Sequence, residues 1–434
     1  MVVPLVEPKI TTQRSNSFPE TPARPGLHAM LSSNKRTNPP TDNLKQWLTH
    51  MGLNLNPFGY IDAGEDPLIP FYLIDHNQFE KIDGDQPSFV FAPAGGGKTA
   101  FRVRLARECR AGWNKRRIFP IVFKPTEPGD PKGDKKRALH QRSDLLRYAA
   151  RELFLYLAYS PYALDDMDDA LRKAFLQTIS WDLDFSIAFY LDQMKTAGSL
   201  EPILTAFDPT ARSLPNPPDK EDILYLYKKL LNHIPESGKP DEGYRLEALF
   251  DLILNKLKFE AIYVLVDGVD AFLETENHPR NALLSVSWLL DNALAWSERG
   301  IYTKYFLPKE IQPFIGETTD FHLLTSKSKI IIIKWDADAL SEVIRRRLQE
   351  ASGGKFDSFT AISDRALRAF GRSPEEILIG DLRRHKKLSP RSLIKTMDRL
   401  FACHVQDEQV REKLTPQDLT AVREWIRREY SAKK

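Results

Sequence analysis

Five short, mostly apolar runs alternate with longer amphipathic stretches along the chain. The runs occupy residues 88–91, 117–123, 261–266, 301–306 and 329–333. Helical spacing of the apolar residues marks most of the sequence between and after them. The run at 261–266 is apolar at every position, which is typical of a strand buried on both faces of a parallel sheet. The pattern therefore predicts an α/β fold in which helices flank a parallel sheet.

Three segments depart from this alternation. Residues 1–41 are rich in Pro, Ser, Thr and Arg without apolar periodicity, and we expect a disordered tail there. Mostly helical sequence at about 141–255 separates the second strand from the third, and a simple crossover needs far less, so we expect a large helical insertion. Every element expected after residue 335 is a helix. The predicted domains are an α/β core over residues 42–335 and an all-helical lid over 336–434.

Local signals refine some of these elements. Pro120 places the second strand near an edge of the sheet, since proline cannot donate to a strand ladder. Residues 124–141 are rich in Pro, Gly, Asp and Lys and predict a long loop with a basic character. Asp336, Ser389 and Thr415 are the residue types that cap helix N-termini, so helices are expected to begin directly after them.

Composition places the chain among ordinary globular proteins. It has 434 residues, of which 42% are hydrophobic and 28% charged, and its net charge of +3 favours neither a nucleic-acid nor a protein partner. The two cysteines, Cys109 and Cys403, form neither a metal-binding spacing nor a disulfide framework. No apolar run is long enough to span a bilayer, and we expect a cytoplasmic protein without membrane contact.

A glycine-rich segment follows the first strand and precedes a helical pattern. It reads Ala92-Pro93-Ala94-Gly95-Gly96-Gly97-Lys98-Thr99. Glycines let the backbone turn its N–H groups onto phosphate oxygens, and the following helix N-terminus adds a positive dipole end. Lys98 is then expected to reach the β- and γ-phosphates, and the Thr99 hydroxyl to hold Mg²⁺. Ala92 stands where the usual G-x-x-x-x-G-K-[ST] pattern has glycine, so the loop is strained only if that position requires a positive φ.

An acidic residue ends the strand predicted at 261–266. Asp267 would lie at the carboxyl end of that strand, where open α/β sheets bind ligands. A carboxylate in that position can organise Mg²⁺ directly or through water. The two motifs together predict a site for a nucleoside triphosphate.

On these residues the chain resembles P-loop NTPases of the AAA+/STAND group, and among them bacterial ATPases similar to origin-recognition and transposition-regulator types. The resemblance rests on the glycine-rich segment, on Asp267-Gly268-Val269-Asp270 and on Ser389-Pro390-Arg391 in the lid, and it covers roughly residues 56–430. It implies ATP and Mg²⁺ as ligands. The phosphate-binding residues would be Ala94, Gly95, Gly96, Gly97, Lys98, Thr99 and Ala100.

The resemblance also implies two residues that act on the γ-phosphate. Asp270 matches the acid that orients the attacking water, and its alternative is a cap for the following helix. Arg391 matches a lid arginine that contacts the γ-phosphate, and its alternative is an exposed arginine. Further candidate sensors are Lys334, at the end of the last strand, and Lys304 and Thr303 in the preceding strand. In the run Arg345–Arg347, at least two of the three arginines are expected to face solvent.

Two classes of function follow from this pattern. The first is an ATPase that acts as a nucleotide-dependent switch or assembly regulator with slow hydrolysis, as a homo-oligomer or with a protein partner. The second is a signalling module that binds ATP or ADP without significant turnover. Association with DNA is a third interpretation, through the basic loop and the C-terminal basic residues Arg423, Arg427, Arg428, Lys433 and Lys434. It predicts binding that weakens steeply with salt.

Overall fold

The computed structural model describes residues 42–66, 69–113, 116–125, 134–183, 220–231, 239–316, 321–368, 371–406 and 412–431. The tail predicted over 1–41 and the basic residues Lys132, Lys433 and Lys434 lie outside these ranges.

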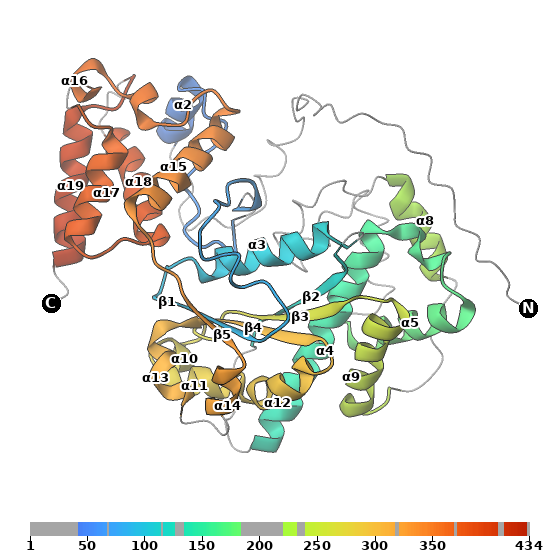
Figure 1. The fold of residues 1–434 in the computed structure, drawn as a ribbon. Coiled ribbons are helices and arrows are strands. Elements are labelled where there is room, and N and C mark those ends of the chain that lie inside the picture. Colours follow the sequence, from blue (N-terminus) through green and yellow to red (C-terminus); the bar gives the residue numbers. More distant parts are fainter. Residues whose placement is uncertain are drawn as a thin grey trace, which may run out of the picture. The chain divides into compact units, whose positions relative to one another are not determined.

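Five parallel strands form a single sheet, as the apolar runs predict (Figure 1). They are β1 (Ser88–Ala92), β2 (Ile118–Phe123), β3 (Ala261–Val266), β4 (Ile301–Pro308) and β5 (Lys329–Ile332). Their order is β2-β3-β4-β1-β5, and every neighbouring pair is parallel. β2 is an edge strand, which explains how Pro120 is accommodated. β3 is buried at all six positions, as its continuous apolar sequence requires.

Alternate side chains of the strands enter two separate cores, one on each face of the sheet. Val90 and Leu265 pack with Phe101 and Leu105 of α3 (Lys98–Ala111) on one face. The opposite face is covered by α4 (Asp134–Tyr159), α9 (Glu242–Asp251) and α12 (Ser287–Ser297). Figure 1 shows α3 on one side of the strands, and α9 and α12 on the other. The chain is therefore an α/β protein with helices on both faces of its sheet.

In the described residues, helices are the only regular elements of the connection from β2 to β3. It contains α4, η2 (Pro161–Leu164), α5 (Asp169–Asp182), α8 (Lys220–Leu231), α9 and a π-helical turn η4 (Leu252–Lys256). α4 begins at Asp134, so the C-terminal part of the loop predicted over 124–141 is helical instead. The first turns of α4 are mostly exposed, and its buried face begins at Gln141 and continues through Leu145, Leu146 and Leu153, which anchor the helix in the core on this face of the sheet.

Short helices join the later strands. α10 (Leu273–Glu276), α11 (Pro279–Leu284) and α12 lie between β3 and β4. η5 (Lys309–Ile311), α13 (Gln312–Ile315) and α14 (Phe321–Ser326) lie between β4 and β5. α11 and α12 are separate helices, because the backbone leaves helical geometry at Val286.

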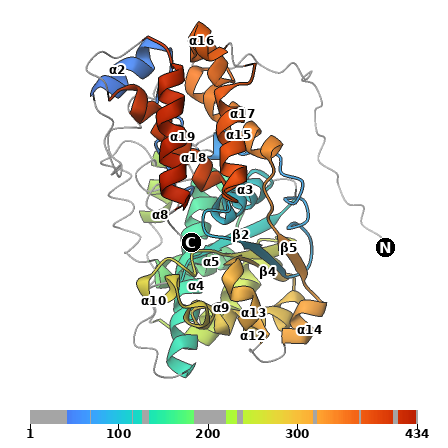
Figure 2. The same cartoon turned by 90° about the vertical axis from the view of Figure 1, so that its left-hand side faces the viewer.

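Only helices follow β5 in the described residues. They are α15 (Ala337–Ser352), η6 (Phe359–Ile362), α16 (Arg365–Arg368), α17 (Pro374–Arg384), α18 (Pro390–His404) and α19 (Pro416–Ser431). The caps predicted at Asp336 and Ser389 are present: the Asp336 carboxylate accepts from the Ala339 N–H at 2.8 Å, and the Ser389 hydroxyl oxygen accepts from the Ser392 N–H at 3.2 Å. The Thr415 N–H donates to the Asp418 carboxylate at 2.8 Å. The two views in Figures 1 and 2 place these helices on the same side of the sheet as α3.

The first described helix, α2 (Asp42–His50), packs against this C-terminal region although the sequence groups it with residues 42–335. The centre of the Trp47 ring lies 5.1 Å from the centre of the Phe401 ring and 4.6 Å from that of the His404 ring. The Trp47 indole N–H donates to the Glu412 carbonyl at 3.1 Å, and the Asn54 N–H donates to the Ala351 carbonyl at 2.8 Å. Residues from the two ends of the described chain therefore share one small core.

Candidate functional site

A glycine-rich loop, residues 93–97, joins β1 to α3. Gly95 and Gly97 have φ values of 71° and 88°, in the left-handed region that favours glycine. The Gly96 N–H donates to the Pro93 carbonyl at 2.9 Å and closes the turn. A Cβ added at Gly96 would lie 2.8 Å from the Cβ of Ala92, so both positions need small residues. Ala92 itself is the last residue of β1 and fully buried, so its extended backbone requires no glycine.

α3 begins at Lys98 with an unobstructed N-terminus. Its N-cap is Gly97, which has no side chain to cap the helix. The N–H groups of the first turn have no partner within the helix, and the dipole places a partial positive charge there. Lys98, Thr99 and Ala100 of this turn line a cavity of about 470 Å³. Such a helix start is suited to binding an anion.

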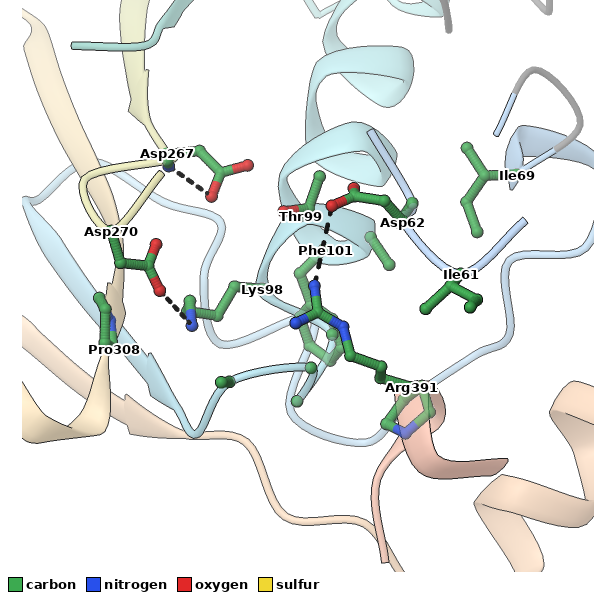
Figure 3. A pocket seen from close by; sticks show the side chains of 18 of the residues that line it. Ile61, Asp62, Ile69, Lys98, Thr99, Phe101, Asp267, Asp270, Pro308 and Arg391 are labelled. Carbon is green, nitrogen blue, oxygen red and sulfur yellow. Dashed lines mark hydrogen bonds and ion pairs between the residues drawn. The ribbon is translucent and has the colours of Figure 1, made fainter. Parts of the chain in front are cut away.

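Two carboxylates at the end of β3 lie on the lining of the same cavity. Asp267 directly follows β3 and is 3% exposed, and Asp270 lies three residues later in the turn. The Lys98 Nζ is 3.6 Å from Asp270 Oδ2 and donates to the Ala92 carbonyl at 3.4 Å (Figure 3). The Asp267 Oδ1 accepts from the Gly268 N–H at 2.9 Å. The lysine of the loop and the acids of the distant strand therefore meet, as the sequence predicts.

A second cation of α3 faces Asp267. The Arg102 Nε donates to Asp267 Oδ2 at 3.4 Å, and the arginine is 1% exposed. Lys98 and Arg102 are four residues apart and so share one face of the helix. Each therefore pairs with one of the two carboxylates after β3. Sequence reasoning missed Arg102, although its spacing from Lys98 on a buried helix was a visible signal.

The N-terminus of α18 touches the glycine-rich loop. The Arg391 N–H donates to the Gly95 carbonyl at 3.3 Å. A Cβ at Gly95 would lie 2.5 Å from the Cβ of Arg391, so only glycine permits this approach. The Arg391 guanidinium extends along the cavity to Asp62, with 3.7 Å between Nη2 and Oδ2, and its side chain is 43% exposed (Figure 3). A half-exposed cation from the C-terminal helices is thus positioned beside the loop.

An apolar wall completes the cavity. Ile69, Tyr72, Ile74 and Phe79, from the segment before β1, belong to it. Arg347 also belongs to the lining; it is buried and donates to the Pro57 carbonyl at 2.6 Å and to the Asp66 carboxylate at 3.3 Å. Its guanidinium lies 4.2 Å from the centre of the Tyr72 ring.

Trp335, between β5 and α15, links this wall to the loop. Its indole N–H donates to the Gly96 carbonyl at 2.9 Å. The His76 ring packs 4.9 Å from the Trp335 ring and 5.2 Å from the Phe101 ring. Burial lowers the pKa of His76 below its usual value, so this histidine is neutral at pH 7. The sequence assigns neither Trp335 nor Asp62 to the site, because both enter the cavity from irregular segments.

The structure brings all the site residues of the sequence analysis to one lining. They are Ala94, Gly95, Gly96, Gly97, Lys98, Thr99, Ala100, Asp267, Asp270 and Arg391.

The further sensor candidates lie elsewhere. Lys304 is fully buried at the opposite end of β1, where its Nζ donates to the carbonyls of Gly84 and Gln86 at 2.7 and 2.8 Å. Lys334 is exposed at the end of β5 and is not part of the lining. Lys304 was a wrong choice because a strand has two ends, and only the carboxyl end faces the loop. In the arginine run, Arg345 and Arg346 are partly exposed beside Glu342 while Arg347 is buried, as expected.

Metal binding at this site depends on which side-chain ligands lie close together. Within the described ranges no three His, Cys, Asp or Glu side chains are grouped closely enough to hold a metal ion by themselves. Mg²⁺ does not need such a group, because it takes one or two protein oxygens together with waters and phosphates. The Thr99 hydroxyl and the Asp267 carboxylate fit that requirement.

Comparison of the chain with protein-family models, with curated proteins and with solved structures finds no match. Among the helices described, none combines the length and apolar character needed to cross a bilayer.

Proposed function

We propose that this protein is an ATP-binding P-loop protein that acts as a nucleotide-dependent switch or assembly regulator and hydrolyses ATP slowly. One observation carries the proposal: the glycine-rich loop, the bare N-terminus of α3 and the acidic end of β3 line the same cavity. A loop of backbone N–H groups beside a lysine and a helix dipole is complementary to a chain of phosphates. The cavity is also within the usual size range for small-molecule sites.

In this proposal each side chain has a separate task. Lys98 leaves its ion pair with Asp270 and binds the β- and γ-phosphates. Thr99 and Asp267 hold Mg²⁺, whose charge would offset that of the phosphates. Residues 69–79 supply an apolar wall for the base. The choice of ATP over GTP rests on the resemblance to AAA+/STAND proteins. Arg391 contacts the γ-phosphate, because it is the partly exposed cation that α18 presents beside the loop.

The C-terminal helices act as the lid in this proposal. α18 contacts the loop through one backbone hydrogen bond and through the Arg391 side chain. A phosphate that binds Arg391 therefore changes the contacts that hold the C-terminal helices in place. Ligands that contact two elements in this way shift the equilibrium between their arrangements. The output is regulated assembly of a homo-oligomer or binding of a protein or DNA partner in the cytoplasm.

A module without significant turnover is the second candidate, and the contact between Lys98 and Asp270 favours it. Asp270 is held by the lysine in this structure and is not free to orient water. Turnover then requires nucleotide to separate the pair. Asp270 is the residue whose substitution distinguishes the two candidates.

Titration of the purified chain with ADP by calorimetry tests the proposal. Lys98→Met should weaken ADP binding by about tenfold or more, because a charge-assisted contact to phosphate is lost. Lys304→Met is the matched control, since it removes another buried lysine that lies outside the cavity. Equal ADP affinity in wild type and Lys98→Met, or binding in neither, would refute the proposal.

Measurement of ATP hydrolysis by the same proteins separates the two candidates. If Asp270 positions the attacking water, Asp270→Asn should lower turnover by about a hundredfold while nucleotide binding is retained. A wild-type protein that binds ATP and shows no turnover above background would favour the signalling module.

A further inference from the structure

The buried pair Arg102 and Asp267 gives this cavity an unusual charge balance. Both side chains are almost fully buried, and 3.4 Å separates Arg102 Nε from Asp267 Oδ2. The other carboxylate oxygen accepts from the Gly268 N–H at 2.9 Å. Both oxygens of the carboxylate proposed to organise Mg²⁺ are therefore already engaged by the protein.

A carboxylate beside a phosphate site normally repels the ligand until a metal cation neutralises it. Burial strengthens this repulsion, because a charge in a low-dielectric environment interacts strongly with its neighbours. In this chain the cation is part of the protein. The Arg102 guanidinium therefore offsets the charge of Asp267 whether or not a metal is bound.

Lys98 cannot serve the same purpose as Arg102. It pairs with Asp270, which is partly exposed and lies at 3.6 Å, so nucleotide can draw the lysine away. Arg102 lies one helical turn deeper, is not part of the cavity lining and holds Asp267 from behind. Lys98 and Arg102 therefore have different roles: Lys98 is available to phosphate, and Arg102 stays with the Asp267 carboxylate.

We propose that Arg102 is a positioning residue that makes nucleotide binding nearly independent of Mg²⁺, by neutralising Asp267 in place of the metal. The inference rests on the proposed nucleotide site, and it adds that this site binds nucleotide almost equally well with and without Mg²⁺. Nucleoside diphosphate is the form of ligand for which the effect is clearest, because it lacks the γ-phosphate that brings the most charge. The protein would retain ADP when magnesium is removed.

Calorimetric titration with ADP, in excess MgCl₂ and in excess EDTA at one fixed ionic strength, tests this inference. The wild-type dissociation constants in the two conditions should agree within about threefold. Arg102→Gln should weaken binding in EDTA by about tenfold or more relative to MgCl₂, since Asp267 is then uncompensated. Arg102→Lys keeps the charge and should restore the wild-type ratio.

Arg110→Gln is the matched control. Arg110 lies on the same helix and forms an equally buried pair with Glu152 at 2.7 Å, outside the cavity lining. Its removal should lower stability as Arg102→Gln does, while leaving the ratio of the two dissociation constants at the wild-type value.

Two results would overturn the inference. One is a wild-type protein whose ADP binding weakens more than about tenfold in EDTA, a comparison that needs no variant to fold. The other is an Arg102→Gln protein whose ratio matches that of wild type. Both leave the proposed function intact, whereas absence of ADP binding in both conditions would remove the proposed function and this inference together.

Discussion

Glycine-rich loops tolerate little substitution, and the reasons differ from one residue to the next. Gly97 needs its positive φ, whereas Gly95 needs both its φ of 71° and the space that Arg391 occupies. Ala92 shows the converse. It replaces a glycine of the usual pattern without strain because its backbone belongs to a strand. Small size and left-handed conformation are separate requirements, and only coordinates distinguish them.

The buried ammonium group of Lys304 should make the stability of the protein depend on pH. Burial lowers the pKa of its ammonium group to about 7, with Asp83 opposing and Lys329 reinforcing the shift. The unfolded chain therefore binds more protons above pH 7, so stability should rise with pH between about 7 and 10. Urea unfolding should show that, between about pH 7 and 9, the free energy of unfolding rises by about 2 kcal/mol more for wild type than for Lys304→Met. Parallel pH profiles for the two proteins would contradict the shift.

At the scale of elements, two contacts decide how the C-terminal helices are held. One is the approach of α18 to the glycine-rich loop through Gly95 and Arg391. The other is the packing of α2 beneath α18, where the Trp47 ring contacts Phe401 and His404. Neither contact is visible in the hydrophobic pattern, because periodicity shows that a face is apolar but not which partner covers it. Both therefore emerge only from the fold.

Truncation of the Trp47 side chain should show how much α2 stabilises the C-terminal helices. Trp47 is 2% exposed, and Trp47→Ala should cost about 3–5 kcal/mol in the free energy of unfolding. Trp425→Ala on α19 is the control: its side chain is only partly buried, so the cost should be about 1 kcal/mol. Urea denaturation followed by tryptophan-independent circular dichroism measures both. Equal losses would mean that α2 contributes little to this core.

For the whole molecule, the cavity is formed by segments that are distant in sequence. The loop after β1, the turn after β3, residues 61–79, Trp335 and the start of α18 all contribute to its lining. A ligand held there contacts both the sheet and the C-terminal helices. Occupation of the cavity is therefore expected to change the mobility of elements well beyond the loop.

Hydrogen exchange tests this coupling. A non-hydrolysable ATP analogue should slow the exchange of amides in residues 93–97 and in the first turn of α18 by about tenfold. Arg391→Ala should abolish the protection of α18 and keep that of the loop, because the arginine is the side chain expected to join them. Lys395→Ala, an exposed cation one turn further along α18, should behave as wild type. Protection of α18 that persists in Arg391→Ala would contradict the role given to this arginine.

The sequence by itself determined the parallel sheet, the sites of all five strands and the residues that meet at its carboxyl edge. Local causes explain this: a fully apolar run must be buried on both faces, and glycines followed by Lys98 and Thr99 predict a loop between a strand and a helix. The tertiary structure alone decided that Arg102 faces Asp267, that α2 joins the C-terminal helices and that Lys304 lies at the far end of β1. These facts depend on which surfaces pack together, and packing partners are chosen by shape and charge across the whole chain, which no local pattern records.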